Sequence, residues 1–229
     1  MSRWQARSLM MLFAVGASLL TGCASGPPLK ETATGQVLAP MPQPERVVGY
    51  KTVSLRDGKE YFNTLVAQTP DTQTWMDSDG CRVVVPRTGF GPALEFTNCE
   101  GSTGTQTVKL LRGAPYPLTL GSKWVYAYSG TNARGDQWTG QRHCEVEGAA
   151  QVAVNGAEHD AYKVVCEDIS GNTKTTRTYY VSPALQTIVF QERYRVRNWV
   201  GAPPPDRTKW EFVSQEAGAV SREGEATSR

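Results

Sequence analysis

Short apolar or alternating segments, separated by turn-forming residues, are the feature that most limits the folds open to this chain. Between Val47 and Ser214 these segments are rich in Thr, Val and Tyr, and they are broken by Gly, Pro, Asn and Asp. Such residues in such a pattern are typical of β-strands. Beyond the N-terminal segment, no window of about 12 residues has the apolar periodicity of a helix. The sequence therefore predicts an all-β fold, an antiparallel sandwich or barrel.

Two dipeptides, Asp57-Gly58 and Asn155-Gly156, each stand between two predicted strands. A tight two-residue turn needs positive φ at both central residues, which Asn, Asp and Gly tolerate. We expect a hairpin at each dipeptide. On the strand that follows the second one, the alternation places Tyr162, Val164 and Cys166 on one face.

A faint internal repeat with an offset of 63 residues runs through this region. It matches Trp75 to Trp138 and Cys81 to Cys144, so that both halves contain Trp-x5-Cys. Duplication of a β unit is one explanation, and coincidence in a β-rich chain is the other. Duplication predicts two tandem, similar β modules over residues 47–113 and 114–213. We also expect Trp75, Trp124 and Trp138 to lie in the core.

Besides Cys23, the chain has four cysteines, an even number that favours disulfides in an oxidising compartment. Three pairings are possible. Cys81–Cys99 with Cys144–Cys166 is favoured, because each bond then closes a local loop within one half. A disulfide that closes a loop of roughly 20 residues stabilises the folded state by about 3 kcal/mol on the chain-entropy model. Zinc binding and redox catalysis are disfavoured because no Cys-x2-Cys pair exists. We expect no metal and no cofactor.

The N-terminal segment has the features of an export signal. Arg3 and Arg7 precede an uncharged apolar run from Leu9 to Leu20. This run is too short to cross a hydrocarbon core of ~30 Å as a helix. It ends in Leu20-Thr21-Gly22-Cys23, which resembles the lipobox of bacterial lipoproteins. An ordinary secretory signal with a chance cysteine, or a buried helix, is the alternative.

The resemblance implies a cleaved signal peptide, residues 1–22, and a covalent diacylglycerol and N-acyl lipid on Cys23. Ala24, where an Asp would retain the protein at the inner membrane by the enterobacterial sorting rule, favours the outer membrane. Several acyl chains anchor a protein durably where one chain does not. The mature β domain also resembles those of uncharacterised proteobacterial envelope lipoproteins. The expected location is therefore the outer membrane, with the domain lipid-anchored and facing the periplasm.

Residues 23–46 and 214–229 are expected to lie outside the folded part. The first segment is rich in proline and lacks aromatic residues, so we expect a lipidated, extended tether. At ~3.1 Å per residue such a tether would reach up to about 70 Å. The second segment is small and charged, and we expect a disordered tail.

Net charge excludes one class of partner. The chain has 24 basic and 22 acidic residues, and two of the basic ones lie in the signal segment that we expect to be cleaved. The mature chain is therefore neutral, without the basic footprint that nucleic-acid binding requires. Motifs for phosphate loops, dinucleotide binding and serine nucleophiles are also missing. We expect neither nucleic-acid binding nor enzymatic activity.

Two features near the C-terminus are candidates for partner binding. Arg193, Arg195 and Arg197 alternate along one predicted strand, and a basic stripe of this kind can meet an anionic surface such as lipopolysaccharide or peptidoglycan. Trp199 and Trp210 flank a proline-rich loop, and aromatic residues are enriched at interfaces. The alternatives are the solvated face of an edge strand and the packing of a late hairpin.

Three functions follow from these features. The leading one is a non-catalytic outer-membrane lipoprotein whose domain binds or scaffolds an envelope protein or glycan. The second is a carrier of a lipid or other apolar ligand, which predicts a barrel cavity of several hundred Å³. The third is an envelope hydrolase, which requires a cleft with converging carboxylates.

Overall fold

The computed structural model describes residues 38–44, 49–56, 59–154, 157–197 and 206–216. Within these ranges all regular structure is β, with twelve strands, which confirms the predicted class. None of the described residues forms a helix with the length and apolarity that crossing a membrane requires. The lipobox residues Leu20 to Cys23, Trp199 and the C-terminal tail lie outside the described part of the chain.

The strands follow one another along the chain with mostly short connections. In order they are β1 (Gly49–Arg56), β2 (Lys59–Gln68), β3 (Thr72–Asp77), β4 (Arg82–Pro86), β5 (Glu95–Cys99), β6 (Ser102–Arg112), β7 (Lys123–Asn132), β8 (Gln137–Val154), β9 (Ala157–Ser170), β10 (Thr173–Ser182), β11 (Thr187–Arg197) and β12 (Asp206–Glu216).

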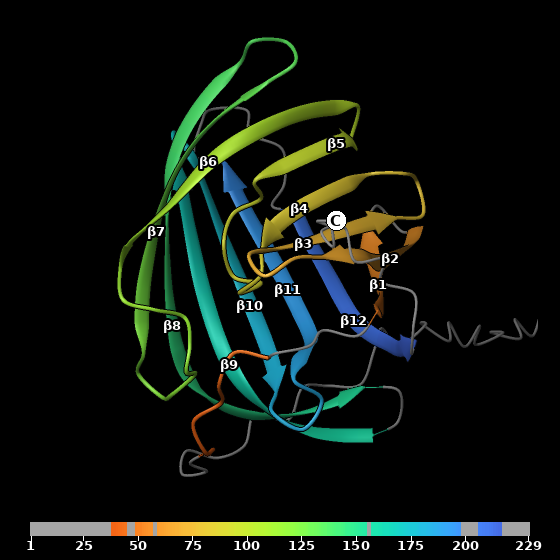
Figure 1. Ribbon diagram of the computed structural model, residues 1–229, viewed down its shortest axis with the longest axis vertical. Coiled ribbons are helices and arrows are strands. Elements are labelled where there is room, and N and C mark those ends of the chain that lie inside the picture. The colour runs from red at the N-terminus through yellow and green to blue at the C-terminus, as the bar shows by residue number, and fades with distance from the viewer. Residues whose placement is uncertain (1–37, 45–48, 57–58, 155–156, 198–205, 217–229) are drawn as a thin grey trace, which may run out of the picture.

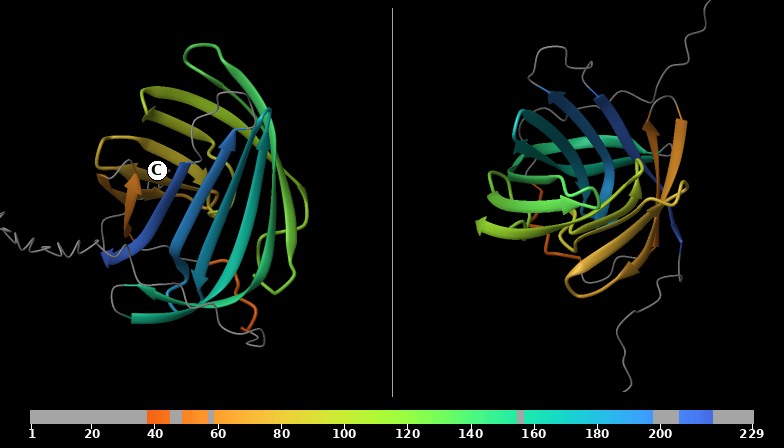
Figure 2. Two further views of the ribbon diagram at one scale, coloured as in Figure 1. Left: turned by 180° about the vertical axis from the view of Figure 1, so that it is seen from behind. Right: turned by 90° about the horizontal axis from the view of Figure 1, so that it is seen from above.

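Each strand pairs antiparallel with its neighbours in sequence, and β1 pairs with both β2 and β12. The ladder therefore closes into a barrel, one of the two predicted architectures (Figures 1 and 2). Both predicted hairpins are present, because Arg56 pairs with Lys59 and Val154 pairs with Ala157. The two turn dipeptides themselves lie outside the described residues.

The two halves of the chain share this one sheet. Strands β6 and β7 pair along most of their length, so the sheet does not divide at residue 113. The repeated Trp-x5-Cys spacing also falls on different structural positions. Trp75 on β3 is separated from Cys81 by a turn, whereas Trp138 and Cys144 lie on the same strand, β8. Equal spacing in the sequence therefore does not give equal structure here.

The main core lies inside the barrel, around Phe90 and Trp124. Strand β9 supplies the predicted face, with Tyr162, Val164 and Cys166 all buried. Trp124 on β7 is fully buried, as expected. The other two tryptophans are only half-buried. Trp138 is held at the sheet by donating its Nε1–H to Gln106 Oε1 at 2.7 Å.

A second, smaller core forms beyond a bulge in the β8–β9 hairpin. The register shifts between Val146 and Gly148, and the hairpin continues past the end of the main core. Its residues then pack on β10 and β11 residues that face away from the main core; this cluster comprises Ala150, Val152, Ala161, Tyr180, Val189 and Phe190. The curled end of this hairpin is visible at the bottom of Figure 1.

Residues 38–44, the described part of the expected tether, pack against the barrel. Met41 forms a two-way backbone bridge with Leu118 and is only 3% exposed. The hydroxyl of Tyr162 donates to the carbonyl of Ala39. The folded region therefore begins at or before Leu38, several residues earlier than the composition predicted.

Both predicted disulfides are present, as Cys81–Cys99 and Cys144–Cys166. The first joins the start of β4 to the end of β5, and both of its cysteines are half-buried. The second joins the directly opposed residues of β8 and β9, and its cysteines are 4% and 0% exposed. Only the first bond is therefore open to attack by a dissolved thiol.

This difference in exposure predicts an order of reduction. Mild dithiothreitol treatment of the native protein, followed by alkylation and peptide mass spectrometry, should label Cys81 and Cys99 first. Labelling of Cys144 and Cys166 should require denaturant, because a thiolate must reach the sulfur that it attacks. Equal labelling of both pairs under native conditions would contradict the burial of the second bond.

Candidate functional site

The connection between β4 and β5 turns into the barrel instead of running over its surface. We call residues 87–94 the plug loop. Gly89 has a φ of 75°, a conformation that residues with a Cβ adopt only with strain. Backbone hydrogen bonds from Arg87 N to Asp71 O and from Leu94 N to Val84 O fix the two ends of the loop. Phe90, at its centre, is fully buried.

Phe90 organises an aromatic cluster in the interior. Its ring centroid lies 5.8 Å from that of Tyr116, 5.3 Å from that of Trp124 and 5.4 Å from that of Tyr179. Pairs at such distances add stability beyond their buried area. The plug loop is thus held by side chains from the β6–β7 connection, β7 and β10.

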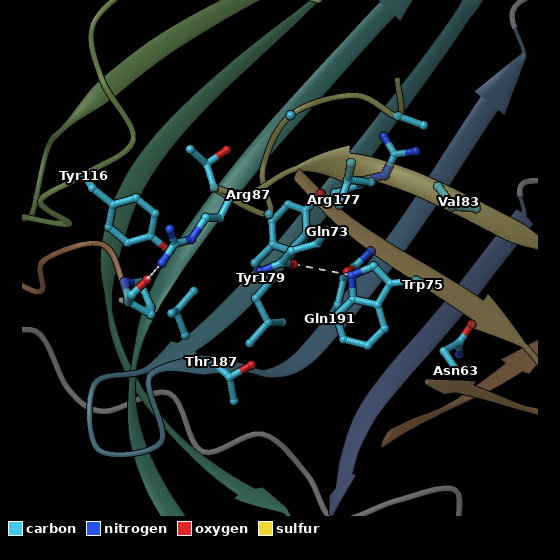
Figure 3. A pocket seen from close by; sticks show the side chains of 18 of the residues that line it. Asn63, Gln73, Trp75, Val83, Arg87, Tyr116, Arg177, Tyr179, Thr187 and Gln191 are labelled. Carbon is cyan, nitrogen blue, oxygen red and sulfur yellow. Dashed lines mark hydrogen bonds between the residues drawn. The ribbon is translucent and has the colours of Figure 1, made fainter. Parts of the chain in front are cut away.

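A cavity of about 330 Å³ remains between the plug loop and the barrel wall (Figure 3). Strands β3 and β4 form one side of it, and strands β10 and β11 form the other. Its lining combines aromatic and aliphatic side chains with amides and three arginines. These residues include Trp75, Val83, Tyr116, Tyr179, Val181, Ile188, Asn63, Gln73, Gln191, Arg87, Arg142 and Arg177.

Trp75 is half-buried because it forms part of this wall rather than of the packed core. Its Nε1–H donates to Gln73 Oε1 at 3.4 Å, as the dashed line in Figure 3 shows. Pro44, from the N-terminal segment, also lines the cavity, and its carbonyl accepts a hydrogen bond from Arg87 Nη2 at 2.7 Å.

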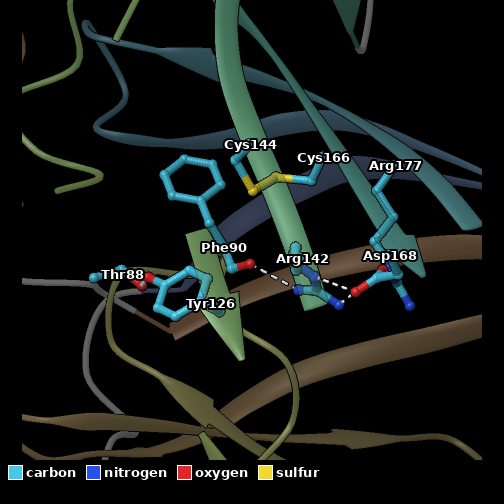
Figure 4. Close-up of a disulfide and its surroundings, with 8 residues drawn as sticks. All are labelled: Thr88, Phe90, Tyr126, Arg142, Cys144, Cys166, Asp168 and Arg177. Atoms are coloured by element: carbon cyan, nitrogen blue, oxygen red, sulfur yellow. Dashed lines mark hydrogen bonds and ion pairs between the residues drawn. A yellow bond between two sulfur atoms is a disulfide. The ribbon is translucent and has the colours of Figure 1, made fainter. Parts of the chain in front are cut away.

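Two of the arginines share one carboxylate, that of Asp168 (Figure 4). Arg142 Nε lies 2.6 Å from Asp168 Oδ1, and Arg142 Nη2 lies 3.1 Å from Oδ2. Arg177 Nη1 contacts the same Oδ2. Arg142 also donates from Nη1 to the carbonyl of Phe90 at 2.7 Å. The cluster therefore joins β8, β9 and β10 to the plug loop.

Positive charge exceeds negative charge in this cluster. Burial first, and then the charges of Arg142, Arg193 and Arg195, together lower the pKa of Arg177 to about 9. A guanidinium with this pKa is still cationic at neutral pH. The lowered pKa shows that the charged form of Arg177 is destabilised in this site. Asp168 supplies a single negative charge for the two arginines.

The predicted arginine stripe lies on the face of the sheet that carries Arg177. Arg193 pairs directly with Arg177, and Arg195 pairs with Thr175, which is buried. Tyr194, on the opposite face, is 38% exposed. The stripe was expected on an outward, solvated face or at a partner surface. The register instead turns its first two members toward the side of the cavity, so they extend its positive charge.

The other candidate partner-binding residues cannot be placed in the same way. Arg197 and Trp210 are assigned to β11 and β12, but their side chains, like all of Trp199, lie outside the described part. A role for these three residues in partner binding stays a prediction.

Several residues of the site were not anticipated from the sequence, namely Phe90, Arg142, Asp168 and Arg177. A signal for two of them was present. Arg142 precedes Cys144 by two residues, and Asp168 follows Cys166 by two. Once the disulfide is paired, strand alternation places both side chains on its face, directly opposite one another in the register.

The site offers little to acid–base or metal chemistry. None of the described residues that line the cavity is acidic, so this cavity does not supply the carboxylate pair that the hydrolase interpretation requires. The described part of the chain also contains no group of three or more His, Cys, Asp or Glu side chains arranged to hold a metal. Asp77 closes the turn before Cys81 by accepting backbone hydrogen bonds from Asp79 and Cys81.

Comparison with solved structures finds a likeness to the hypothetical lipoprotein YmcC of Escherichia coli K12. The two chains are 13% identical, the match covers 75% of this chain and 90% of that one, and the TM-score is 0.49. No protein-family model and no curated protein matches the sequence. The proposals below therefore depend on the residues of this chain alone.

The shared carboxylate predicts a large stability effect. Asp168→Asn should lower the free energy of unfolding by about 3 kcal/mol, because the buried Arg142 and the half-buried Arg177 lose their counter-charge. Urea unfolding followed by circular dichroism measures this change. Glu145→Gln is the matched control, since the exposed pair with Lys123 (2.9 Å) contributes less than about 1 kcal/mol. Similar losses in both variants would contradict the role of Asp168.

Proposed function

We propose that the chain is an envelope lipoprotein, anchored in the outer membrane through Cys23, whose barrel holds a small, partly apolar ligand. The interior cavity of about 330 Å³ carries this proposal. Binding and release of the ligand are the whole function in this proposal, and the domain performs no chemistry on it.

The size and lining of the cavity support a small molecule. Small-molecule sites have volumes of about 300–1,000 Å³ and combine apolar walls with a few well-placed polar groups. This cavity lies at the lower end of that range. A compound with one short chain or one ring system fits such a volume, whereas a whole two-chain phospholipid does not.

The contents of the barrel favour ligand binding over scaffolding. A scaffold needs a recognition surface on its exterior, and the described part of the arginine stripe faces the other way. Trp75, which the repeat placed in the core, instead lines the cavity beside Gln73. Aromatic and amide groups at such a wall are typical of ligand contacts.

The proposed anchor would keep the cavity near the membrane. Fourteen residues lie between Cys23 and Leu38, where the described structure begins, so the Cα atoms of these two residues are at most ~50 Å apart. Pro44, a few residues further along, already lines the cavity. A ligand taken from or delivered to the membrane would therefore travel a short distance.

A cavity-filling variant tests the ligand proposal. Gln191 lines the cavity on β11, and Tyr194 lies on the opposite face of the same strand. Gln191→Trp should exclude the ligand by occupying its volume, whereas Tyr194→Trp should not. Native mass spectrometry of each protein, released gently from its own envelope, should show an added small-molecule mass on the wild type and on Tyr194→Trp only. The same added mass on Gln191→Trp would place the ligand elsewhere.

A second variant tests the anchor. Cys23→Ser removes the thiol that the lipobox resemblance assigns to diacylglycerol. The variant should incorporate no labelled palmitate and should leave the membrane fraction, because acyl chains supply the anchoring. Ser25→Ala is the matched control and should behave as the wild type. Continued membrane association of an unlabelled Cys23→Ser protein would show that something other than lipidation holds it there.

A further inference from the structure

We propose that the ligand of this cavity is a single-chain amphiphile with one anionic head group, a carboxylate or a phosphate, bound at Arg177. This inference depends on the proposed ligand-binding function and adds the chemical class of the ligand. Four features carry it: the charge of the lining, the donors of Arg177, the two neighbouring arginines and the apolar remainder of the cavity.

The charge of the lining is positive. Arg87, Arg142 and Arg177 line the cavity, and no acidic residue among the described ones does. Asp168 lies behind Arg142 and Arg177 and can neutralise only one of them. Buried charges are costly unless they are paired. An anion entering the cavity would add to the single negative charge that the described residues place beside Arg142 and Arg177.

The donors of the two arginines are used differently. Arg142 donates from Nε and Nη2 to Asp168 and from Nη1 to Phe90, which fixes it as a positioning residue. Arg177 makes one such contact, from Nη1 to Asp168. Its side chain is 20% exposed and reaches the cavity. Its Nε and Nη2 make no hydrogen bond to any described residue, and a guanidinium edge of this kind matches a carboxylate or a phosphate.

The neighbouring strand adds more positive charge beside this arginine. Arg193 lies directly opposite Arg177 in the register, and Arg195 lies two residues further on the same face. Arg195 is also the register partner of Asp206 on β12, and the charges of both arginines act on Arg177, whose pKa they lower. Charges that are partly buried are screened only weakly by salt, so their field would act on an anion at physiological ionic strength.

The remainder of the cavity suits a short apolar tail. Trp75, Val83, Val181 and Ile188 supply the apolar wall of the cavity. Burying a methylene group contributes about 0.8 kcal/mol. A tail of several carbons would therefore add substantially to the affinity of the head group alone.

A series with one tail and different head groups tests the inference. The full-length lipidated chain in phosphatidylcholine nanodiscs would be titrated calorimetrically with octanoate, octyl phosphate, octanol and octylamine, with empty nanodiscs subtracted. Octanoate and octyl phosphate should bind at least tenfold more tightly than octanol, and octylamine more weakly than octanol. Acetate and inorganic phosphate should bind at least tenfold more weakly than their octyl counterparts, because they lack the tail.

Variants locate the head group. Arg177→Gln should abolish the preference for the anionic compounds, and Arg134→Gln, which removes an exposed arginine from the β7–β8 hairpin, should keep it. Arg195→Gln should reduce the preference severalfold without touching the contact with Asp168, which keeps the inference testable if Arg177→Gln does not fold. Gln191→Trp should abolish binding of the whole octyl series.

The outcomes separate the two proposals. Equal affinity for octanoate and octanol would overturn the anionic head group while leaving a ligand-binding cavity in place. Equal affinity for octanoate and acetate would overturn the amphiphile and indicate a site for small anions. Failure of every octyl compound to bind, together with the lack of any co-purifying mass, would overturn the proposed function as well.

Discussion

The carboxylate of Asp168 is the interaction on which the interior of this barrel depends. It accepts Arg142 from one neighbouring strand and Arg177 from the other, and so ties β8, β9 and β10 together by their inward side chains. Arg142 also joins these strands to the plug loop, because its Nη1 donates to the carbonyl of Phe90. The plug loop is thereby held inside the barrel, and the aromatic cluster around Phe90 can form. The cavity is the space that this loop leaves unfilled.

Stability alone does not account for this arrangement. Buried ion pairs often contribute no more than apolar residues of the same volume would, since removing charges from water is costly. Two arginines on one carboxylate are less favourable still, and the pKa of Arg177 is lowered by its burial and then by the charge of Arg142. A barrel that only had to be stable could fill its interior with aliphatic side chains. An unbalanced charge next to a cavity is better explained by a function that uses the charge, and anion binding is the simplest of these.

Local patterns in the sequence were enough to predict the strands. The arrangement of the site depends instead on contacts between residues far apart in the chain. Strand alternation and turn dipeptides depend on a few neighbouring residues, so the β class, both hairpins and the buried face of β9 could be predicted, and the short loops favoured the correct disulfides. Alternation also showed that Arg193 and Arg195 share a face, but it cannot say which face points inward, because that depends on barrel closure. The entry of the plug loop into the barrel could not be predicted either, because the residues that contact the loop come from strands far away in the chain. The repeat predicted equivalent positions for Trp75 and Trp138. Equal spacing in the sequence did not place the two side chains in equivalent surroundings, for the same reason.

The N-terminal segment connects the proposed anchor to the proposed site through consecutive contacts. Ala39 accepts a hydrogen bond from Tyr162, Met41 bridges to Leu118, and Pro44 accepts one from Arg87 while lining the cavity. The segment that would follow the proposed anchor at Cys23 therefore becomes part of the cavity wall before the first strand begins. Under the proposed anchoring, these contacts would make the usable tether shorter than its composition suggests and would keep the barrel near the bilayer. A binding site confined in this way meets membrane-derived amphiphiles at a high local concentration, so even modest affinity would be sufficient for exchange with the membrane.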